Sequence, residues 1–492
     1  MTVTIPFDNT YARLPERFFA RLDPTPVPNP QIVRINTGLA ETLGLDPQAL
    51  ASPEGAAILA GNRVPEGSAP IALAYAGHQF GNFVPQLGDG RALLLGEVVG
   101  RDGLRRDIQL KGSGPTPFSR NGDGRAALGP VLREYLVSEA MAAMDVPTTR
   151  TLAAVTTGEP VRRETLLPGA VLTRIAASHI RVGTFQYFAA RRDTEALRAL
   201  ADYAIDRHYP EARQAENPYL ALLDGVVAAQ AELVARWLLL GFIHGVMNTD
   251  NTAISGETID YGPCAFMDAY DPGTVFSSID FYGRYAYGNQ PNIAQWNVAR
   301  LAETLLPLLS GDDTSSLALA EQSLSGFAPR FEAAYQAGLR RKLGLVKEQE
   351  GDNRLVHDLL LMMRDAKADF TLTFRSLCDA AGGSGGDVAV KVLFGETAGY
   401  VEWAERWRHR LGAEEAGPET HGAAMRAVNP AVVPRNHMVE AALSAAVQHR
   451  DYGPFEEMLR VVTRPFEDPV GLETYTLPPK PEERVLQTFC GT

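Results

Sequence analysis

The chain has little cysteine and no excess of basic residues. Its 492 residues include three cysteines, Cys264, Cys378 and Cys490, which are too few for a disulfide scaffold and lack metal-ligand spacing. Lys and Arg number 46 against 59 Asp and Glu, so the formal net charge is −13. Such a charge disfavours long contacts with nucleic acid or an anionic membrane. We therefore expect no nucleic-acid partner and a reducing, cytoplasmic location.

A membrane-spanning run and a signal peptide are also lacking. The longest apolar run, 226–243, is interrupted by Gln230, Glu232 and Arg236, which a lipid bilayer would penalise. The N-terminal MTVTIPFDNTY has neither the basic start nor the apolar core of a signal peptide. We predict that 226–243 is a buried amphipathic helix and that the protein has no membrane partner.

The length and the order of sequence patterns predict several packed units. The chain exceeds the ~250–300 residues at which a single core stops growing. Residues 1–70 mix polar helices with Pro-rich connections, whereas 71–200 are rich in strand-like apolar runs. Residues 201–330 and 331–492 are chiefly helical. The predicted fold class is α+β, with a sheet-rich lobe, a helical lobe and a helical extension at each end, and we expect a monomer.

The sheet-rich lobe contains one turn signal and one clear helix signal. The turn at 88–90, Gly-Asp-Gly, lies between apolar runs and indicates a hairpin, because Asp-Gly is a strong hairpin signal. Residues 129–144 carry apolar side chains at helical spacing. Strands are expected again at 148–164 and 170–176.

The loop HGVMNTDN at 244–251 directly follows the longest apolar run. In protein kinases the loop H-R-D-x-x-x-x-N carries a base in its third position and a metal-binding Asn in its eighth. His244 and Asn251 keep that spacing, whereas Val246 occupies the position of the base and Asp250 stands directly before the Asn. The loop therefore resembles a kinase loop in which the acid has moved.

A candidate metal ligand follows this loop. Asp260-Tyr261-Gly262 comes directly after an apolar residue and fits the kinase D-F-G pattern, whose Asp binds the metal. Mg²⁺ prefers oxygen ligands, and phosphates and water complete its shell. Asn251 and Asp260 would supply two protein oxygens.

Lys111 is a candidate for contact with nucleotide phosphates. It ends the predicted strand DIQLK, at the position of the kinase lysine that meets the phosphates and a helix Glu. The following helix offers Glu134 and Glu139 as partners, and we favour Glu134 because it lies nearer the start of the helix. A Lys–Glu pair in a partly buried cleft keeps both groups charged.

Glycines and arginines around this lysine suggest a phosphate-binding cradle. Gly-Asp-Gly-Arg occurs at 88–91 and again at 122–125. Glycine allows backbone N–H groups to approach phosphate oxygens, and arginine presents a fork of donors to them. Arg174 and Arg181 add positive charge from a neighbouring segment. The alternative interpretation is that the glycines form two tight hairpin turns.

Three long stretches resemble the selenoprotein O family. They are GHQFGNFVPQLGDGRALLLGEV, QLKGSGPTPFSRNGDGRAALGPVLREYLVSEAM and GVMNTDNTAISGETIDYGPCAFMDAYDP, and the likeness extends over nearly the whole chain. The resemblance implies a bilobal protein-kinase-like fold. It also implies transfer of AMP from ATP to Ser, Thr or Tyr hydroxyls of protein substrates, with release of pyrophosphate. The nucleotide would be held flipped relative to ordinary kinases, so that the α-phosphate meets the hydroxyl.

The resemblance also implies roles for individual residues. Asp250 would accept the proton, and Asn251 and Asp260 would bind Mg²⁺ or Mn²⁺. Arg174 and Arg181 would stabilise the leaving pyrophosphate. The residues implied in binding ATP are Gly88, Gly90, Arg91, Lys111, Asp123, Gly124, Arg174, Arg181 and Asp260.

The tail FCGT places Cys490 near the C-terminus. Some eukaryotic relatives in the resembled family carry selenocysteine there, whereas bacterial relatives commonly carry cysteine. The resemblance suggests Cys264 as its partner in a switchable disulfide. An inert buried thiol and a tail without a role are the alternative.

Two other function classes stay open. A small-molecule phosphotransferase would use a compact H-G-D loop, and Val246 at the Asp position counts against it. A catalytically inactive nucleotide-binding scaffold is favoured by Val246 and opposed by Asp250. Replacement of Asp250 by Ala distinguishes these classes, because a scaffold would keep its function and an enzyme would lose it.

Overall fold

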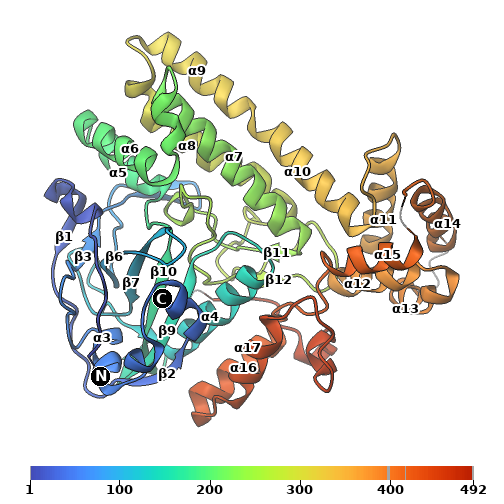
Figure 1. Ribbon diagram of the computed structural model, residues 1–492, viewed down its shortest axis with the longest axis horizontal. Coiled ribbons are helices and arrows are strands. Elements are labelled where there is room, and N and C mark those ends of the chain that lie inside the picture. Colours follow the sequence, from blue (N-terminus) through green and yellow to red (C-terminus); the bar gives the residue numbers. More distant parts are fainter. Residues whose placement is uncertain (1, 396–398, 416, 490–492) are drawn as a thin grey trace.

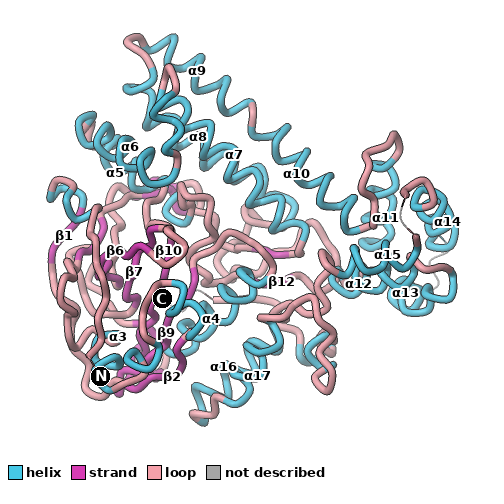
Figure 2. Tube along the Cα trace, in the orientation of Figure 1, coloured by secondary structure: helices cyan, strands magenta, loops and turns pink. Residues whose placement is uncertain are grey.

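The computed structural model describes residues 2–395, 399–415 and 417–489. Figure 1 shows a sheet-rich lobe built from the first part of the chain, with long helices (green and yellow) beside it. The helices of residues 352–426 form a separate cluster at the far end of the molecule. Figure 2 shows that the strands are concentrated in the sheet-rich lobe. The chain is mixed α+β, as the sequence predicts.

An antiparallel sheet is the centre of the sheet-rich lobe. Its strands run in the order β1-β3-β6-β7-β10-β9-β2, and β8 pairs with β10. The bounds are β1 Phe19–Arg21, β2 Gln31–Ile35, β3 Ile71–Leu73, β6 Ala92–Val99, β7 Arg105–Lys111, β8 Ala126–Ala127, β9 Arg150–Arg162 and β10 Leu166–Ala176. Two short pairs lie outside it: β4 Gly77–Gln79 with β5 Asn82–Val84, and β11 Phe242–Ile243 with β12 Ala265–Phe266.

The N-terminal extension is not purely helical, which corrects the expectation for residues 1–70. Its strands β1 and β2 form the two ends of the sheet, where Phe19 pairs with Leu73 and Gln31 pairs with Thr156. The extension also contains the helices α1 Thr37–Thr42, α2 Pro47–Leu50 and α3 Pro53–Leu59. Apolar side chains of these helices pack on one face of the sheet. The extension therefore completes the sheet, and the domain boundaries stay predictions.

The hairpin between β6 and β7 turns at a different place from the one predicted. Leu93 pairs with Leu110 and Val99 with Arg105, so the turn lies at 100–104, where a second Asp-Gly occurs. The Gly-Asp-Gly at 88–90 instead leads into β6 and runs beside β3. The backbone N–H of Asp89 donates to the carbonyl oxygen of Leu73 at 2.9 Å.

The helix predicted at 129–144 is α4, Leu128–Ala143. It packs against β9 and β10, and its Leu132 and Leu136 are completely buried. Glu134 and Glu139 are buried on it as well. Glu139 binds the Arg150 guanidinium, whereas Glu134 turns toward the end of β7. Two buried carboxylates on one helix therefore have different partners.

Arg133 on α4 joins segments that are distant in the sequence. Its guanidinium donates to the carbonyl oxygens of Gly262, at 3.0 Å, and Cys264. It also donates to the side chains of Asn436, at 3.1 Å, and Glu440, at 2.9 Å. Those two residues belong to α16 Asn436–His449, which packs against α4 together with α17 Gly453–Val462. The C-terminal helices therefore brace the segment that follows the Asp-Tyr-Gly motif.

The helical lobe is built around α7. Its helices are α5 Val182–Ala190, α6 Thr194–His208, α7 Pro218–Leu239, α8 Gln290–Leu309, α9 Asp313–Ser325 and α10 Phe327–Lys342. Among the described helices, α7 alone is long and apolar enough to span a membrane by length and composition, and half of its most apolar window is buried. It packs against α8 and α10. The prediction of a helix over 226–243 is confirmed up to Leu239, whereas Phe242 and Ile243 at the end of the run form the strand β11. The expected lack of a membrane partner stays a prediction.

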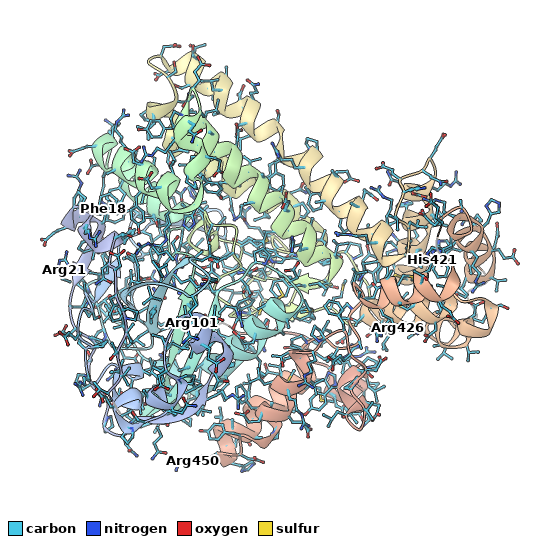
Figure 3. The ribbon with its side chains drawn as sticks, viewed as in Figure 1. Phe18, Arg21, Arg101, His421, Arg426 and Arg450 are labelled. Atoms are coloured by element: carbon cyan, nitrogen blue, oxygen red, sulfur yellow. The ribbon has the colours of Figure 1, made fainter. Side chains whose placement is uncertain are left out.

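The far cluster consists of α11 Asp352–Ala366, α12 Phe370–Ala380, α13 Asp387–Phe394, α14 Gly399–Leu411 and α15 Pro418–Arg426. In its core the rings of Trp403 and Trp407 stack with centroids 5.4 Å apart. Figure 3 shows His421 and Arg426 at this end of the molecule and Phe18 at the opposite end. The cluster therefore lies away from the sheet.

Candidate active site

A cavity of about 800 Å³ lies between the sheet-rich lobe and the helical lobe. The end of β7, α4, and the loops around 88–91 and 118–125 line one side. The loops around 246–251 and 260–263 line the other. The structure brings together here the predicted site residues Gly88, Gly90, Arg91, Lys111, Asp123, Gly124, Glu134, Arg174, Arg181, Asp250, Asn251 and Asp260.

Three cationic side chains converge on the carboxylate of Asp260. Lys111 Nζ lies 2.8 Å and Arg174 Nη1 lies 2.7 Å from Asp260 Oδ1, and Arg181 Nη1 lies 2.9 Å from Oδ2. Lys111 Nζ also contacts Glu134 Oε2 at 2.6 Å, which is the pair favoured by the sequence. The phosphate candidates and the metal candidate thus form one ionic cluster.

Burial and these cations act on Asp260 in opposite directions. Burial raises the pKa of its carboxyl, but Lys111, Arg174 and Arg181 outweigh burial and hold the pKa well below its usual range. The residue has a left-handed backbone with φ of 64°, which few residues other than glycine adopt. Its neighbour Tyr261 is buried and contacts the Thr148 hydroxyl. Asp260 is therefore a charged carboxylate held in a constrained conformation.

The loop 244–251 is fixed from beneath by His244. The ring Nε2 of His244 lies 2.9 Å from the carbonyl oxygen of Ile259, and the ring stacks on Trp237. Burial lowers the pKa of His244, so the ring has little tendency to carry charge, and its role is to hold the loop in place. Val246 lines the cavity and offers no group that can accept a proton. The loop is thereby joined to the segment that carries the metal candidate.

Asp250 is a buried carboxylate with one oxygen unused by the described residues. Its Oδ1 has no hydrogen-bond partner there, while Oδ2 accepts from Gln79 Nε2 at 3.2 Å. Burial raises the pKa of Asp250 to about 6. Arg181 Nε is a second buried polar atom without a partner among the described residues. Both residues line the cavity, so the site contains hydrogen-bonding capacity that the described residues leave unmet.

The hairpin β4–β5 covers this loop, and its Gln79 is a site residue that the sequence does not predict. The backbone N–H of His78 donates to Thr249 Oγ1 at 2.6 Å, and that of Phe80 donates to Asn248 Oδ1 at 3.0 Å. A Cβ at Gly77 would lie 2.4 Å from Asp250 Oδ1, so only glycine fits there. Gln79 belongs to the stretch GHQFGNF, which shows neither helical nor strand periodicity, so no local pattern indicates its position in the site.

The glycines of both Gly-Asp-Gly-Arg elements allow close packing around the cavity. A Cβ at Gly88, where φ is 67°, would lie 2.3 Å from the Phe118 ring, and one at Gly124 would lie 2.1 Å from the Gly114 backbone. Ser113 and Arg125 form an isolated antiparallel bridge that closes a wide loop. Neither element is therefore a tight hairpin turn, which excludes the alternative interpretation.

Further basic side chains line the cavity beside Asp123. Arg163 Nη1 lies 2.8 Å from Asp123 Oδ2, so this carboxylate forms an ion pair with an arginine. Arg120 and Arg162 also line the cavity. No local sequence pattern identifies Arg162 and Arg163, because they reach the cavity only through the pairing of β9 with β10.

Cys264 is a free and fully buried thiol, and burial raises its pKa to about 11. Cys490 lies outside the described residues. The tail approaches Cys264 as far as Thr488, whose Oγ1 donates to the carbonyl oxygen of Pro263 at 2.5 Å. The proposed disulfide partner is thus two positions beyond a residue anchored next to Cys264.

Comparison with known proteins matches residues 1–463 to a family described as protein adenylyltransferase SelO. The chain is 65% identical, over the full length of both chains, to a protein nucleotidyltransferase YdiU of Rhodopseudomonas palustris strain BisB18. It has the same identity to proteins of that name in Bradyrhizobium sp. strain ORS 278 and Methylorubrum populi, again over both full lengths.

Proposed function

Because the chain belongs to the SelO family of protein adenylyltransferases and is therefore a protein nucleotidyltransferase, we propose that the cavity between its lobes is the active site. The family also supports a kinase-like arrangement of the two lobes. The observation that carries the proposal is the convergence of three cations on Asp260, beside the buried carboxylate of Asp250.

The cationic cluster binds the triphosphate of ATP. Ammonium and guanidinium groups form charge-assisted hydrogen bonds with phosphate oxygens. The buried Nε of Arg181 has no hydrogen-bond partner among the described residues. The glycine loops let backbone N–H groups approach the same oxygens. The nucleotide-binding set is Gly88, Gly90, Arg91, Lys111, Asp123, Gly124, Arg174 and Arg181.

Asn251 and Asp260 fit a divalent cation, Mg²⁺ or Mn²⁺. Asn251 Nδ2 donates to the Val246 carbonyl oxygen at 3.0 Å, which leaves Asn251 Oδ1 available as a ligand. The described residues contain no cluster of three or more His, Cys, Asp or Glu side chains suited to a metal. Mg²⁺ with a nucleotide usually takes only one or two protein oxygens. When bound, it would offset charge on the phosphates.

The reaction is a substitution at the α-phosphorus of ATP. A protein hydroxyl oxygen bonds to this phosphorus, the bond to the oxygen that bridges to the β-phosphate breaks, and pyrophosphate leaves. Asp250 accepts the hydroxyl proton, and its raised pKa of about 6 makes it a stronger base than an ordinary carboxylate. Arg174 and Arg181 stabilise the departing pyrophosphate. Val246 at the usual base position disfavours ordinary phosphoryl transfer.

Labelled nucleotides test this function. In a lysate, label from α-³²P ATP should enter protein Ser, Thr or Tyr residues, or the enzyme itself, and label from γ-³²P ATP should not. Asp250→Ala should stop the transfer while calorimetry still detects ATP binding. Asp271→Ala, at an exposed carboxylate, is the control. Protein labelling from γ-³²P ATP at a comparable rate would support a kinase instead, and unchanged transfer by Asp250→Ala would remove its role as the base.

A disulfide between Cys264 and Cys490 would tether the tail beside the segment that holds Asp260. The anchoring of Thr488 on Pro263 supports this pairing. Oxidised glutathione would take the two electrons and leave as two thiols. Peptide mapping after this treatment should find Cys264 joined to Cys490, and the rate of AMP transfer should be lower. A reducing agent should reverse both changes. Two free thiols under these conditions would refute the pairing.

A further inference from the structure

A short loop beside the active site exposes three large apolar side chains. In residues 277–284, Ile279 is 55% exposed, Phe281 84% and Tyr282 98%. Soluble proteins rarely gather large apolar side chains at the surface without a binding role. Ile279 also lines the active-site cavity together with Asp250. The three exposed apolar residues therefore adjoin the active-site cavity through Ile279.

The backbone of this loop is held firmly in spite of its exposed side chains. Asp280 is buried, and its carboxylate accepts from the backbone N–H groups of Arg284, at 2.9 Å, and Tyr285, at 2.8 Å. The Tyr285 hydroxyl donates to Asn248 Oδ1 at 2.6 Å, in the loop of Asp250. On the other side, the Ser278 N–H donates to the Thr488 carbonyl oxygen. The apolar side chains thus project from a pre-organised base.

An arginine without a carboxylate partner stands next to the apolar group. The Arg284 guanidinium lies 4.8 Å from the centroid of the Trp296 ring, and no described carboxylate lies within 4.0 Å of it. Its Nε is buried and lacks a hydrogen-bond partner among the described residues. Arg300 lies over the same ring at 4.8 Å but is paired with Glu303. Arg284 is therefore a cation that no described carboxylate neutralises.

We propose that residues 277–284 are the docking surface for the acceptor polypeptide. An apolar side chain of the acceptor packs on Phe281 and Tyr282, and a carboxylate of the acceptor binds Arg284. The occupant is a polypeptide because the enzyme acts on proteins and the surface is continuous with the cavity through Ile279. This inference rests on the proposed function, since the docked segment must present its hydroxyl to Asp250.

The apolar half is tested with Phe281→Ser combined with Tyr282→Ser. The probe is an array of short peptides, each with one Ser, Thr or Tyr flanked at varied positions by Leu, Glu, Lys or Ala, together with α-³²P ATP. We expect the KM for Leu-containing peptides to rise at least tenfold, with kcat and ATP affinity unchanged. Val470→Ser, at an exposed apolar residue that does not line the cavity, should leave the KM as it is. An unchanged KM in the double variant would overturn the surface.

The polar half is tested by charge reversal. The wild type should favour peptides with a Glu flank, and Arg284→Glu should reverse the preference to a Lys flank. Arg198→Glu is the control, because Arg198 also lies over an aromatic ring, that of Tyr219. Equal labelling of all flanks, the same profile in Arg284→Glu, or label confined to the enzyme would each overturn the docking surface. Absence of α-label from both peptides and enzyme would instead contradict the proposed function.

Discussion

Two buried ionic clusters of similar composition have different consequences. Between α6 and the strands β6 and β7, Arg207 contacts Glu97 and Asp107 at 2.6 Å each, and His179 Nδ1 lies 2.9 Å from Asp107. The remaining Arg207 donor, Nε, binds the Ala177 carbonyl oxygen. Each carboxylate of this cluster is paired with Arg207, and none of its residues lines the cavity, although His179 Nε2 has no hydrogen-bond partner among the described residues.

The active-site cluster opens onto the cavity. Three cations share the Asp260 carboxylate, and the guanidinium Nε of Arg181 stays unpartnered among the described residues. A matched buried cluster stabilises a fold, whereas a cluster with spare donors beside a cavity can bind an anion. Burial and charge therefore do not distinguish the two clusters. Each contains a buried nitrogen without a partner in the described part of the chain, His179 Nε2 in one and Arg181 Nε in the other, but only Arg181 lines the cavity.

The largest expected effect is on catalysis when Asp260 is changed. Asp260→Asn should lower the rate of AMP transfer by about 10⁴-fold, because the anchor of three cations and a metal ligand is lost. Calorimetry with Mg²⁺ and ATP should show weaker binding at the same time. Asp271→Asn is the control. A rate within tenfold of the wild type would show that the two clusters do not differ in function.

The converse change is Arg207→Met, in the matched cluster. Removing one partner of a buried ionic network should lower the free energy of unfolding by about 3 kcal/mol. The folded variant should keep its kcat within about twofold, since Arg207 does not reach the cavity. Arg213→Met, which breaks an exposed ion pair with Asp206, should cost less than about 1 kcal/mol in urea unfolding. Equal losses in both variants would contradict the comparison.

The matched cluster should also determine part of the response to acid. Burial lowers the pKa of His179 to about 4, below the value near 6.5 of an unfolded histidine. The unfolded chain therefore binds this proton more tightly, and stability is lost as the pH falls from about 6.5 toward 4. We expect about 2 kcal/mol, measured by urea unfolding at pH 7 and pH 4.5. His179→Gln should reduce that difference, and an unchanged difference would refute the assignment.

The smallest expected effect concerns Gln79. Gln79→Ala removes a donor to Asp250 and should lower the transfer rate by about tenfold, because the loss of one positioning hydrogen bond is worth about 1–1.5 kcal/mol. ATP affinity should stay the same, which separates positioning of the base from nucleotide binding. Gln86→Ala on the exposed neighbouring loop is the control. Full activity in Gln79→Ala would show that the hydrogen bond from Gln79 does not position Asp250.

The sequence predicts those parts of the site whose signals are local. The spacing of His244 and Asn251, and the strand end at Lys111, are visible in short windows, and α4 has clear helical periodicity. Gln79 could not be identified, because its contact with Asp250 arises from the docking of β4–β5 on a loop far along the chain. The edge strands β1 and β2 are short and lie among prolines, so strand alternation is absent from them.

The bracing by Arg133 has a consequence for synthesis of the protein on the ribosome. The segment after Asp260 is held partly by bonds from Arg133 to Asn436 and Glu440, which come much later in the sequence than the segment itself. Bacterial-type translation proceeds at ~5–20 residues per second, so this brace arrives on the order of ten seconds after the segment itself. In a nascent chain, the segment after Asp260 is therefore made before the contacts of Arg133 with Asn436 and Glu440 can form.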